Sequence, residues 1–115
     1  MFSKLPGFVA VTVLCLACNR QVAGGSIDGA KVYEGACASC HGAAGKPSAS
    51  MAASLRVRDL TDSEFRARVT PALVETQVRK GSTNKIMPAF QDVLSDAQIS
   101  AVAAFVVAGK FAPTP

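Results

Sequence analysis

Two cysteines and a histidine stand close together in the segment Cys37-Ala38-Ser39-Cys40-His41. At this spacing each cysteine sulfur can form a thioether with a vinyl group of one haem, and the adjacent histidine reaches the iron from the same turn. The rest of the chain then has to fold around one covalently bound haem. This requirement constrains the fold more than any other feature of the sequence.

Two other kinds of site use a closely spaced cysteine pair. A thioredoxin-like redox pair needs a βαβ context, and the alternating apolar pattern of strands is not seen in this sequence. A zinc site needs about four ligands, but His41 is the only histidine and the expected mature chain has no second cysteine pair. We therefore predict one haem c per chain, attached at Cys37 and Cys40, with its iron held by His41.

The sixth position of the iron needs another donor, and methionine or histidine is usual in c-type cytochromes. The candidates in the mature chain are Met51 and Met87. Met51 lies among alanines and serines, close to His41 in sequence. Met87 precedes Pro88, which restricts it to an extended conformation, and it lies far enough along the chain to return over the opposite haem face. The pattern favours Met87 as the axial ligand; its alternative role is that of a buried gap-filler.

The first residues look like an export signal. Lys4 gives a positive start, and the apolar run from Leu5 to Ala17 has about 13 residues, whereas a membrane-spanning helix needs about 20. We predict that residues 1–17 are a signal peptide cleaved after Ala17, so that the protein is exported to the periplasm. The alternative is a short membrane anchor that stays attached.

Cleavage after Ala17 would make Cys18 the first residue of the mature chain, and a left-over cysteine in an exported protein needs an explanation. The segment Leu14-Cys15-Leu16-Ala17-Cys18 resembles a bacterial lipoprotein signal, although Cys15 and Leu16 depart from the usual residues. A lipidated Cys18 would attach the protein to the membrane surface. The alternative is an unmodified Cys18 after an ordinary signal peptide.

The helical signals indicate an all-α fold with three to four helices around the haem. Residues 18–27 are polar and rich in glycine, so we predict a flexible tether there, followed by a haem domain at 28–115. A first helix should begin near Ser26 or Asp28, either of which could cap it. The stretch 42–53 is rich in Gly, Ala, Ser and Pro and is predicted to be a loop.

Later helices are marked by capping signals and by proline or glycine at their ends. A capping box at 61–64 should open one helix, and Thr70, followed by proline, should cap the next, which ends at Gly81. A second capping box begins at Ser95 and opens the last helix, which Gly109 ends. The residues between the last two helices are predicted to be a loop.

The formal net charge of the whole chain is +4. Loss of Lys4 with the signal and addition of two haem propionates would bring the charge to roughly +1. The sequence has no basic run and no interleaving of basic with aromatic residues. This pattern argues against nucleic-acid binding.

The chain resembles the class I cytochromes c from Asp28 to Phe111. The residues that carry the resemblance are Gly29, Tyr33, Cys37, Cys40, His41, Gly42, Lys80, Gly81, Ile86 to Phe90, Leu94 to Asp96 and Phe105. The resemblance implies a methionine loop that supplies the second axial ligand. It also implies that the two terminal helices cross closely, with Gly29, Tyr33 and Phe105 at the contact.

One stretch departs from the family pattern. In the family, a backbone carbonyl in a segment with proline, one further residue and leucine accepts the N–H of the proximal histidine. Residues 53–55 (Ala-Ser-Leu) match that place here, and Pro47 is the other candidate for the acceptor. The chain has no tryptophan to bond a propionate; Arg56, Arg58 or Tyr33 could do so, although plain solvation is the simpler expectation for the two arginines.

A haem with both axial positions filled has no room for a substrate at iron, so its chemistry is one-electron transfer. We therefore expect an electron carrier rather than an enzyme, with a redox donor and a redox acceptor as protein partners. Two alternatives stay open. One is a haem subunit of a larger oxidoreductase, and the other is a small haem enzyme or gas sensor in which Met87 leaves the iron.

Overall fold

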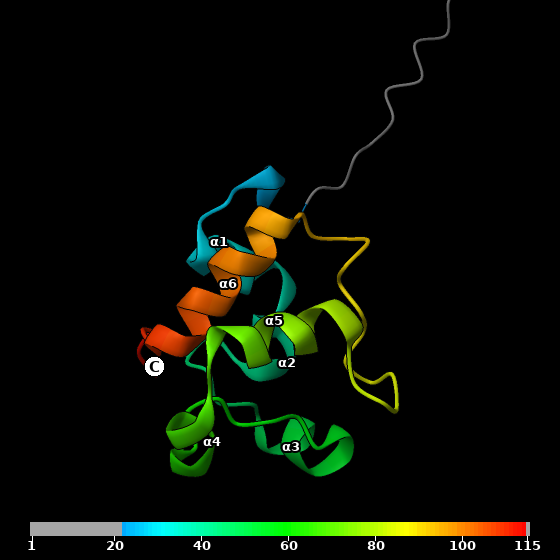
Figure 1. Cartoon of the computed structure of the whole chain (residues 1–115). Coiled ribbons are helices and arrows are strands. Elements are labelled where there is room, and N and C mark those ends of the chain that lie inside the picture. Colours follow the sequence, from blue (N-terminus) through cyan, green and yellow to red (C-terminus); the bar gives the residue numbers. More distant parts are fainter. Residues whose placement is uncertain (1–21, 115) are drawn as a thin grey trace, which may run out of the picture.

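The computed structural model describes residues 22–114, and every regular element in this part of the chain is helical (Figure 1). The prediction of an all-α fold is therefore confirmed, but the described residues form six α-helices rather than three to four, because the short helices α2 and α3 were not expected. The predicted signal peptide (1–17) and Cys18 lie outside the described residues. Within 22–114 no helix has the length and apolarity needed to cross a membrane. The elements are η1 (Val22–Gly25), α1 (Gly29–Ala36), α2 (Ala38–His41), α3 (Ala49–Leu55), α4 (Ser63–Arg68), α5 (Pro71–Lys80) and α6 (Asp96–Ala108).

Helices α1 and α6, from the two ends of the domain, cross in close contact (Figure 1). Gly29 permits the close approach, because a Cβ atom at this position would overlap the carbonyl oxygen of Ala101 and lie 2.9 Å from Cβ of Phe105. The rings of Tyr33 and Phe105 are tilted against each other, with centroids 5.2 Å apart. The helix contact that the resemblance implied, through Gly29, Tyr33 and Phe105, is confirmed.

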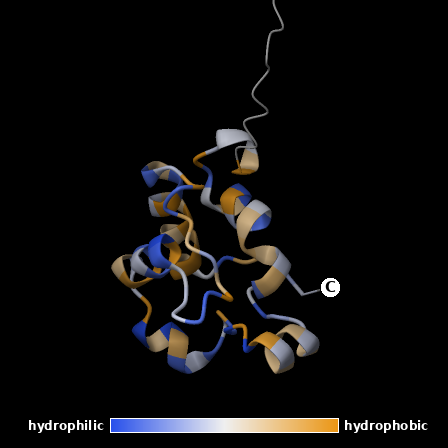
Figure 2. Cartoon of the chain, turned by 90° about the vertical axis from the view of Figure 1, so that its right-hand side faces the viewer, coloured by the Kyte–Doolittle hydropathy of each residue, from blue (hydrophilic) through white to orange (hydrophobic). Residues whose placement is uncertain are grey.

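The hydrophobic core lies where α1, α5 and α6 meet. Val32, Ile99 and Val102 are fully buried, and α5 adds Val74 and Val78. Burial of each such side chain contributes about 1.5–3 kcal/mol relative to exposure, so this cluster holds the three helices together. Figure 2 shows that the helices carry both hydrophobic and hydrophilic residues, as expected for helices that bury one face.

Three of the predicted helix starts are confirmed. Asp28 caps α1, because its carboxylate accepts from the backbone N–H of Ala30 at 2.9 Å. At the start of α6, the Ser95 hydroxyl accepts from the backbone N–H of Gln98 at 3.2 Å, while the Gln98 side chain accepts from the backbone N–H of Ser95 at 3.1 Å. At the start of α5, the Thr70 hydroxyl accepts from the backbone N–H of Leu73 at 3.2 Å. These bonds satisfy N–H groups that have no partner within the helix.

The predicted capping box at 61–64 is shifted by one residue. The cap of α4 is Asp62, whose carboxylate accepts from the backbone N–H of Phe65 at 3.0 Å. The Thr61 hydroxyl donates instead to the carboxylate of Asp59 at 2.5 Å. Because aspartate caps a helix at least as well as threonine, the neighbouring Asp59 decides which of the two residues takes the position.

The loop predicted at 42–53 is wrong in its second half, where α3 forms. The Ser48 hydroxyl accepts from the backbone N–H of Met51 at 3.2 Å and caps this helix. Alanine has the highest helix propensity of all residues, and three alanines lie in α3, which outweighs the loop-like composition around them. Arg56 ends the helix in the left-handed conformation, with φ 51°.

The described part of the predicted tether, residues 22–27, lies against the helices. Val22–Gly25 forms the short 3₁₀ turn η1. The buried Gln98 side chain donates from Nε2 to the backbone carbonyls of Val22 and Ser26, at 3.0 Å each. Residues 22–27 therefore belong to the folded domain, and the earlier part of the predicted tether lies outside the described residues.

Candidate haem site

The Cys-x-x-Cys-His segment lies at the junction of α1 and α2. Cys37 is both the C-cap of α1 and the N-cap of α2, and the backbone N–H of His41 donates to the carbonyl of Cys37 at 2.9 Å. Gly42 then ends the turn with φ 82°, a conformation that favours glycine. The helical turn brings Cys37, Cys40 and His41 to the wall of the same cavity.

That cavity has a volume of about 810 Å³, within the range of sites that hold small molecules and cofactors. All the predicted site residues among the described ones line it: Cys37, Cys40 and His41 from the α1–α2 junction, and Met87 from the loop before α6. Met51, the other candidate for the sixth ligand, is on α3 and is not among the lining residues. The structure thus brings together the predicted cysteines, the histidine and one methionine.

Apolar side chains form most of the remaining wall. They come from every part of the domain between the cysteines and the end of α6: Leu55, Val57, Leu60, Phe65, Val69, Leu73, Val74, Val78, Ile86, Pro88, Phe90, Val102 and Val106. A haem c requires two thiols, one imidazole and a largely apolar surround, and this set of donors and walls fits it. The chemistry of the residues present is therefore that of a haem c site.

The imidazole of His41 is oriented by the backbone. Its Nδ1 atom lies 2.9 Å from the carbonyl oxygen of Arg58, and because a carbonyl can only accept, Nδ1 carries the proton. Nε2 is then the unprotonated nitrogen, available to a metal ion. The acceptors proposed from the sequence, residues 53–55 and Pro47, are wrong, because the acceptor is the carbonyl of Arg58. Residues 53–55 lie in the last turn of α3, and the chain reaches the imidazole only after it has left that helix.

Tyr33 braces the same segment from the side of the helix crossing. Its hydroxyl donates to the carbonyl of Gly42 at 2.7 Å, directly after the motif. Burial, and to a smaller degree the nearby Cys37, raises the pKa of Tyr33, so the hydroxyl remains a donor at neutral pH. Tyr33 was considered as a propionate partner from the sequence, but its hydroxyl proton is used by Gly42.

The two thiols differ in exposure. Cys37 is half-buried and Cys40 is exposed. Burial, together with the neighbouring Cys40, raises the pKa of the Cys37 thiol to about 11. Before haem attachment, Cys37 is therefore a protonated thiol at neutral pH.

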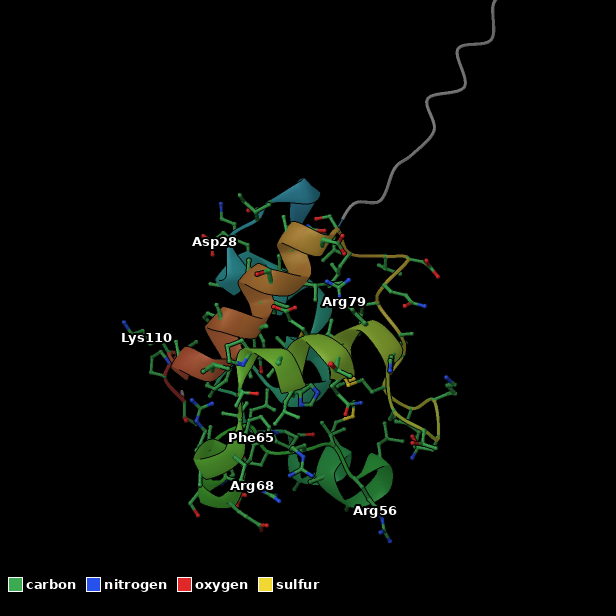
Figure 3. All side chains as sticks on the ribbon, in the orientation of Figure 1. Asp28, Arg56, Phe65, Arg68, Arg79 and Lys110 are labelled. Atoms are coloured by element: carbon green, nitrogen blue, oxygen red, sulfur yellow. The ribbon has the colours of Figure 1, made fainter. Side chains whose placement is uncertain are left out.

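Three arginines line the cavity, namely Arg56, Arg58 and Arg68. Figure 3 shows Arg56 beside α3 and Arg68 on α4, with Phe65 near the space below α5. The guanidinium of Arg58 lies over the Phe65 ring at 5.7 Å from its centroid. From the sequence, Arg58 was a candidate propionate partner with solvation as the simpler expectation, whereas Phe65 and Arg68 were not assigned to the site. The sequence contains no local signal that places Phe65 and Arg68 at the cavity, because this placement arises only when α4 packs beside the haem motif.

Comparisons with known proteins agree with this site. A model of the family described as "Cytochrome C oxidase, cbb3-type, subunit III" matches residues 27–106. A solved structure of the KustC0563 c-type cytochrome superposes with a TM-score of 0.64 at 28% sequence identity, over 72% of this chain and 98% of that one. A mutant of the same cytochrome gives a TM-score of 0.63 at 26% identity, over 72% and 99% of the two chains. No curated protein matches.

Proposed function

The chain belongs to the family of cbb3-type cytochrome c oxidase subunit III, and from this membership we propose that it is a one-electron carrier and not an enzyme. Members of this family carry covalently bound haem c with its iron, and electron transport is their general role. The observation that carries the proposal is the placement of His41 and Met87, from two separate segments, on the wall of one cavity.

In this proposal Cys37 and Cys40 would attach the haem, and His41 and Met87 would hold its iron. The bound haem supplies reversible one-electron chemistry between Fe(III) and Fe(II). The carbonyl of Arg58 fixes the tautomer and orientation of His41. The apolar wall excludes water, which disfavours the more highly charged oxidised state and raises the reduction potential. With both axial positions filled, the protein has no place for a substrate at iron.

The experiment that tests this proposal is a visible and near-infrared spectrum of the purified holoprotein in both oxidation states, with carbon monoxide added to the reduced form. A sulfur-to-iron charge-transfer band in the oxidised spectrum, and slow or undetectable carbon monoxide binding, are expected. A parent protein without the band that binds carbon monoxide rapidly would contradict the carrier and favour a haem enzyme or gas sensor.

A second candidate function is a haem c subunit of a larger oxidoreductase, which the family description favours because it names an oxidase subunit. The haem site would be the same, but the partner would be fixed rather than exchanging. Gentle purification of the protein from its own host distinguishes the two. A persistent complex supports the subunit, whereas an isolated monomer supports the free carrier.

The proposal includes export by the predicted signal peptide (1–17) and, as a finer hypothesis, lipidation of Cys18. A lipid at Cys18 would hold the haem domain near the membrane surface, where redox partners could reach it. The intact mass of protein from its own host tests this hypothesis. A mature chain that begins at Cys18 with acyl chains supports the anchor, and an unmodified N-terminus leaves a soluble periplasmic carrier.

A further inference from the structure

The loop that follows α5 holds Met87 through a hydrogen-bond network centred on one side chain. The Ser82 hydroxyl accepts from the backbone N–H of Met87 at 3.0 Å, and the backbone N–H of Ser82 donates to the carbonyl of Met87 at 2.9 Å. Ser82 therefore satisfies both backbone groups of Met87. We call these two bonds between Ser82 and the backbone of Met87 the Ser82 bracket. The bracket fixes the backbone from which the methionine side chain reaches the cavity.

Asn84 orients the hydroxyl. The Ser82 hydroxyl donates its single proton to Oδ1 of Asn84 at 2.7 Å, which leaves its lone pairs for the N–H of Met87. The same Oδ1 atom accepts from the backbone N–H of Ile86 at 3.1 Å, so the amide of Asn84 has one consistent orientation. Ser82 and Asn84 both line the haem cavity.

The ends of the loop are fixed as well. Gly81 has φ +70°, and a Cβ atom there would lie 2.5 Å from the carbonyl oxygen of Met87. The backbone at position 81 can therefore approach the backbone of Met87 this closely only because the residue is glycine. The Gln77 side chain donates to the carbonyl of Gly81 at 2.8 Å. At the other end, the backbone N–H of Phe90 donates to the carbonyl of Val78 at 2.9 Å.

The conformation at the tip of the loop is consistent with these bonds. Lys85 has φ 63°, a left-handed conformation that is unfavourable for a residue with a side chain. Such a conformation persists only where surrounding contacts impose it. The contacts here are the donation from the Lys85 N–H to the Ser82 carbonyl at 3.0 Å and the two bonds of Asn84.

We infer that Ser82, oriented by Asn84, is a positioning residue that holds Met87 ready for the haem iron. This inference rests on the proposed role of Met87 as an axial ligand. A thioether is a neutral ligand, so the extent to which it stays bound depends on how little the loop can move. The bracket preorganises the loop, so that the methionine does not have to be ordered each time it binds.

The test uses four variants of the holoprotein. Ser82→Ala removes the acceptor of the Met87 N–H, and Asn84→Ala removes the group that orients the hydroxyl. Ser82→Thr keeps a hydroxyl and is the conservative rescue. Thr83→Ala is the matched control, because the exposed Thr83 side chain forms no hydrogen bond within residues 22–114.

Two quantities separate a positioning role from a merely structural one. In reduced protein, carbon monoxide should bind about fivefold faster to Ser82→Ala than to the parent, the effect of losing one ordinary hydrogen bond. In oxidised protein, guanidinium should abolish the sulfur-to-iron band of Ser82→Ala well before it abolishes the helical circular dichroism. Asn84→Ala should shift both quantities in the same direction, and Ser82→Thr and Thr83→Ala should match the parent.

Several results would overturn the inference. If the parent shows the band but Ser82→Ala and Asn84→Ala bind carbon monoxide at the parent rate, the side chains do not position Met87. If Ser82→Ala and Asn84→Ala lose the sulfur-to-iron band and the helical circular dichroism at the same guanidinium concentration, the hydrogen bonds of Ser82 stabilise the fold as a whole and do not position Met87. If Ser82→Ala does not fold, the exposed Asn84 still decides the question through Asn84→Ala. A parent that lacks the band refutes the proposed ligation itself.

Discussion

Arg66 donates from one guanidinium nitrogen to the carbonyl of Val106 at 2.7 Å, and from the other to the carbonyl of Val107 at 2.5 Å. The two carbonyls are at the C-terminal end of α6, where positive charge is favourable, and the Val106 carbonyl also accepts from the backbone N–H of Gly109 at 3.2 Å. Arg66 thus joins α4, which carries cavity residues, to the helix that packs on α1.

We predict that Arg66→Ala lowers the free energy of unfolding by about 2–3 kcal/mol, since two charge-assisted hydrogen bonds are lost. Arg68→Ala is the matched control on the same helix, because its ion pair with Glu64 is exposed, with side chains 65% and 76% accessible, and should contribute less than about 0.5 kcal/mol. Guanidinium unfolding followed by circular dichroism gives both values. Equal losses in the two variants would show that the bonds of Arg66 do not stabilise the fold.

The crossing of α1 and α6 leads to a second prediction. Gly29→Ala should destabilise the protein by about 1–3 kcal/mol, because the new methyl group overlaps the backbone of Ala101. Gly35 is in the same helix, and a Cβ there would meet its nearest atom, Cγ1 of Val22, at 3.3 Å. Gly35→Ala should be neutral or stabilising, because alanine is the better helix former by about 1 kcal/mol. Thermal unfolding compares the two; a neutral Gly29→Ala would mean that the helices can separate at no cost.

A third prediction concerns the turn that presents the carbonyl of Arg58 to His41. Burial of the Asp59 carboxyl by itself raises its pKa, but the hydrogen bonds from Thr61 and the charge of Lys46 outweigh burial, so the pKa of Asp59 is lowered. A folded-state pKa below the unfolded value of about 3.9 contributes stability that is complete above that value and is lost as the pH falls through the folded pKa.

Asp59→Asn keeps an oxygen that can accept from Thr61 but removes the ionisable carboxyl group. The variant should therefore be less stable than the parent at neutral pH, and the difference should shrink as the pH falls below about 4. Melting temperatures between pH 7 and pH 2 measure this, with Asp92→Asn as a control at an exposed loop carboxylate. A difference that stays constant over the whole range would contradict the role of the Asp59 charge.

The parts of the fold that the sequence predicts are those with local causes. Ser95 and Thr70 mark helix starts because their hydroxyls bond residues three positions along the chain. The spacing of Cys37, Cys40 and His41 identifies the cofactor because the chemistry needs one helical turn. Gly29 and Phe105 are further apart in sequence, and their contact was expected only through the resemblance to a known family.

The parts that could not be predicted depend on distant segments. Arg58 accepts from His41 across 17 positions, and its carbonyl is in place only because Arg56 turns the chain out of α3 in a left-handed conformation. No residue preference marks that turn, since glycine rather than arginine is usual there. Phe65 follows directly after the predicted capping box at 61–64, and its place on the cavity wall results from the packing of α4.

The last prediction decides whether the iron has two protein ligands. Met87 lines the cavity on a braced loop, whereas Met51 is on α3 and does not line it. Met87→Ala should abolish the sulfur-to-iron band of the oxidised protein and lower the reduction potential, because a thioether favours Fe(II). The reduced variant should also bind carbon monoxide faster than the parent, while Met51→Ala should change neither property. Near-infrared spectra, potentiometry and carbon monoxide kinetics measure these effects, and a band that disappears in Met51→Ala but survives in Met87→Ala would reverse the ligand assignment.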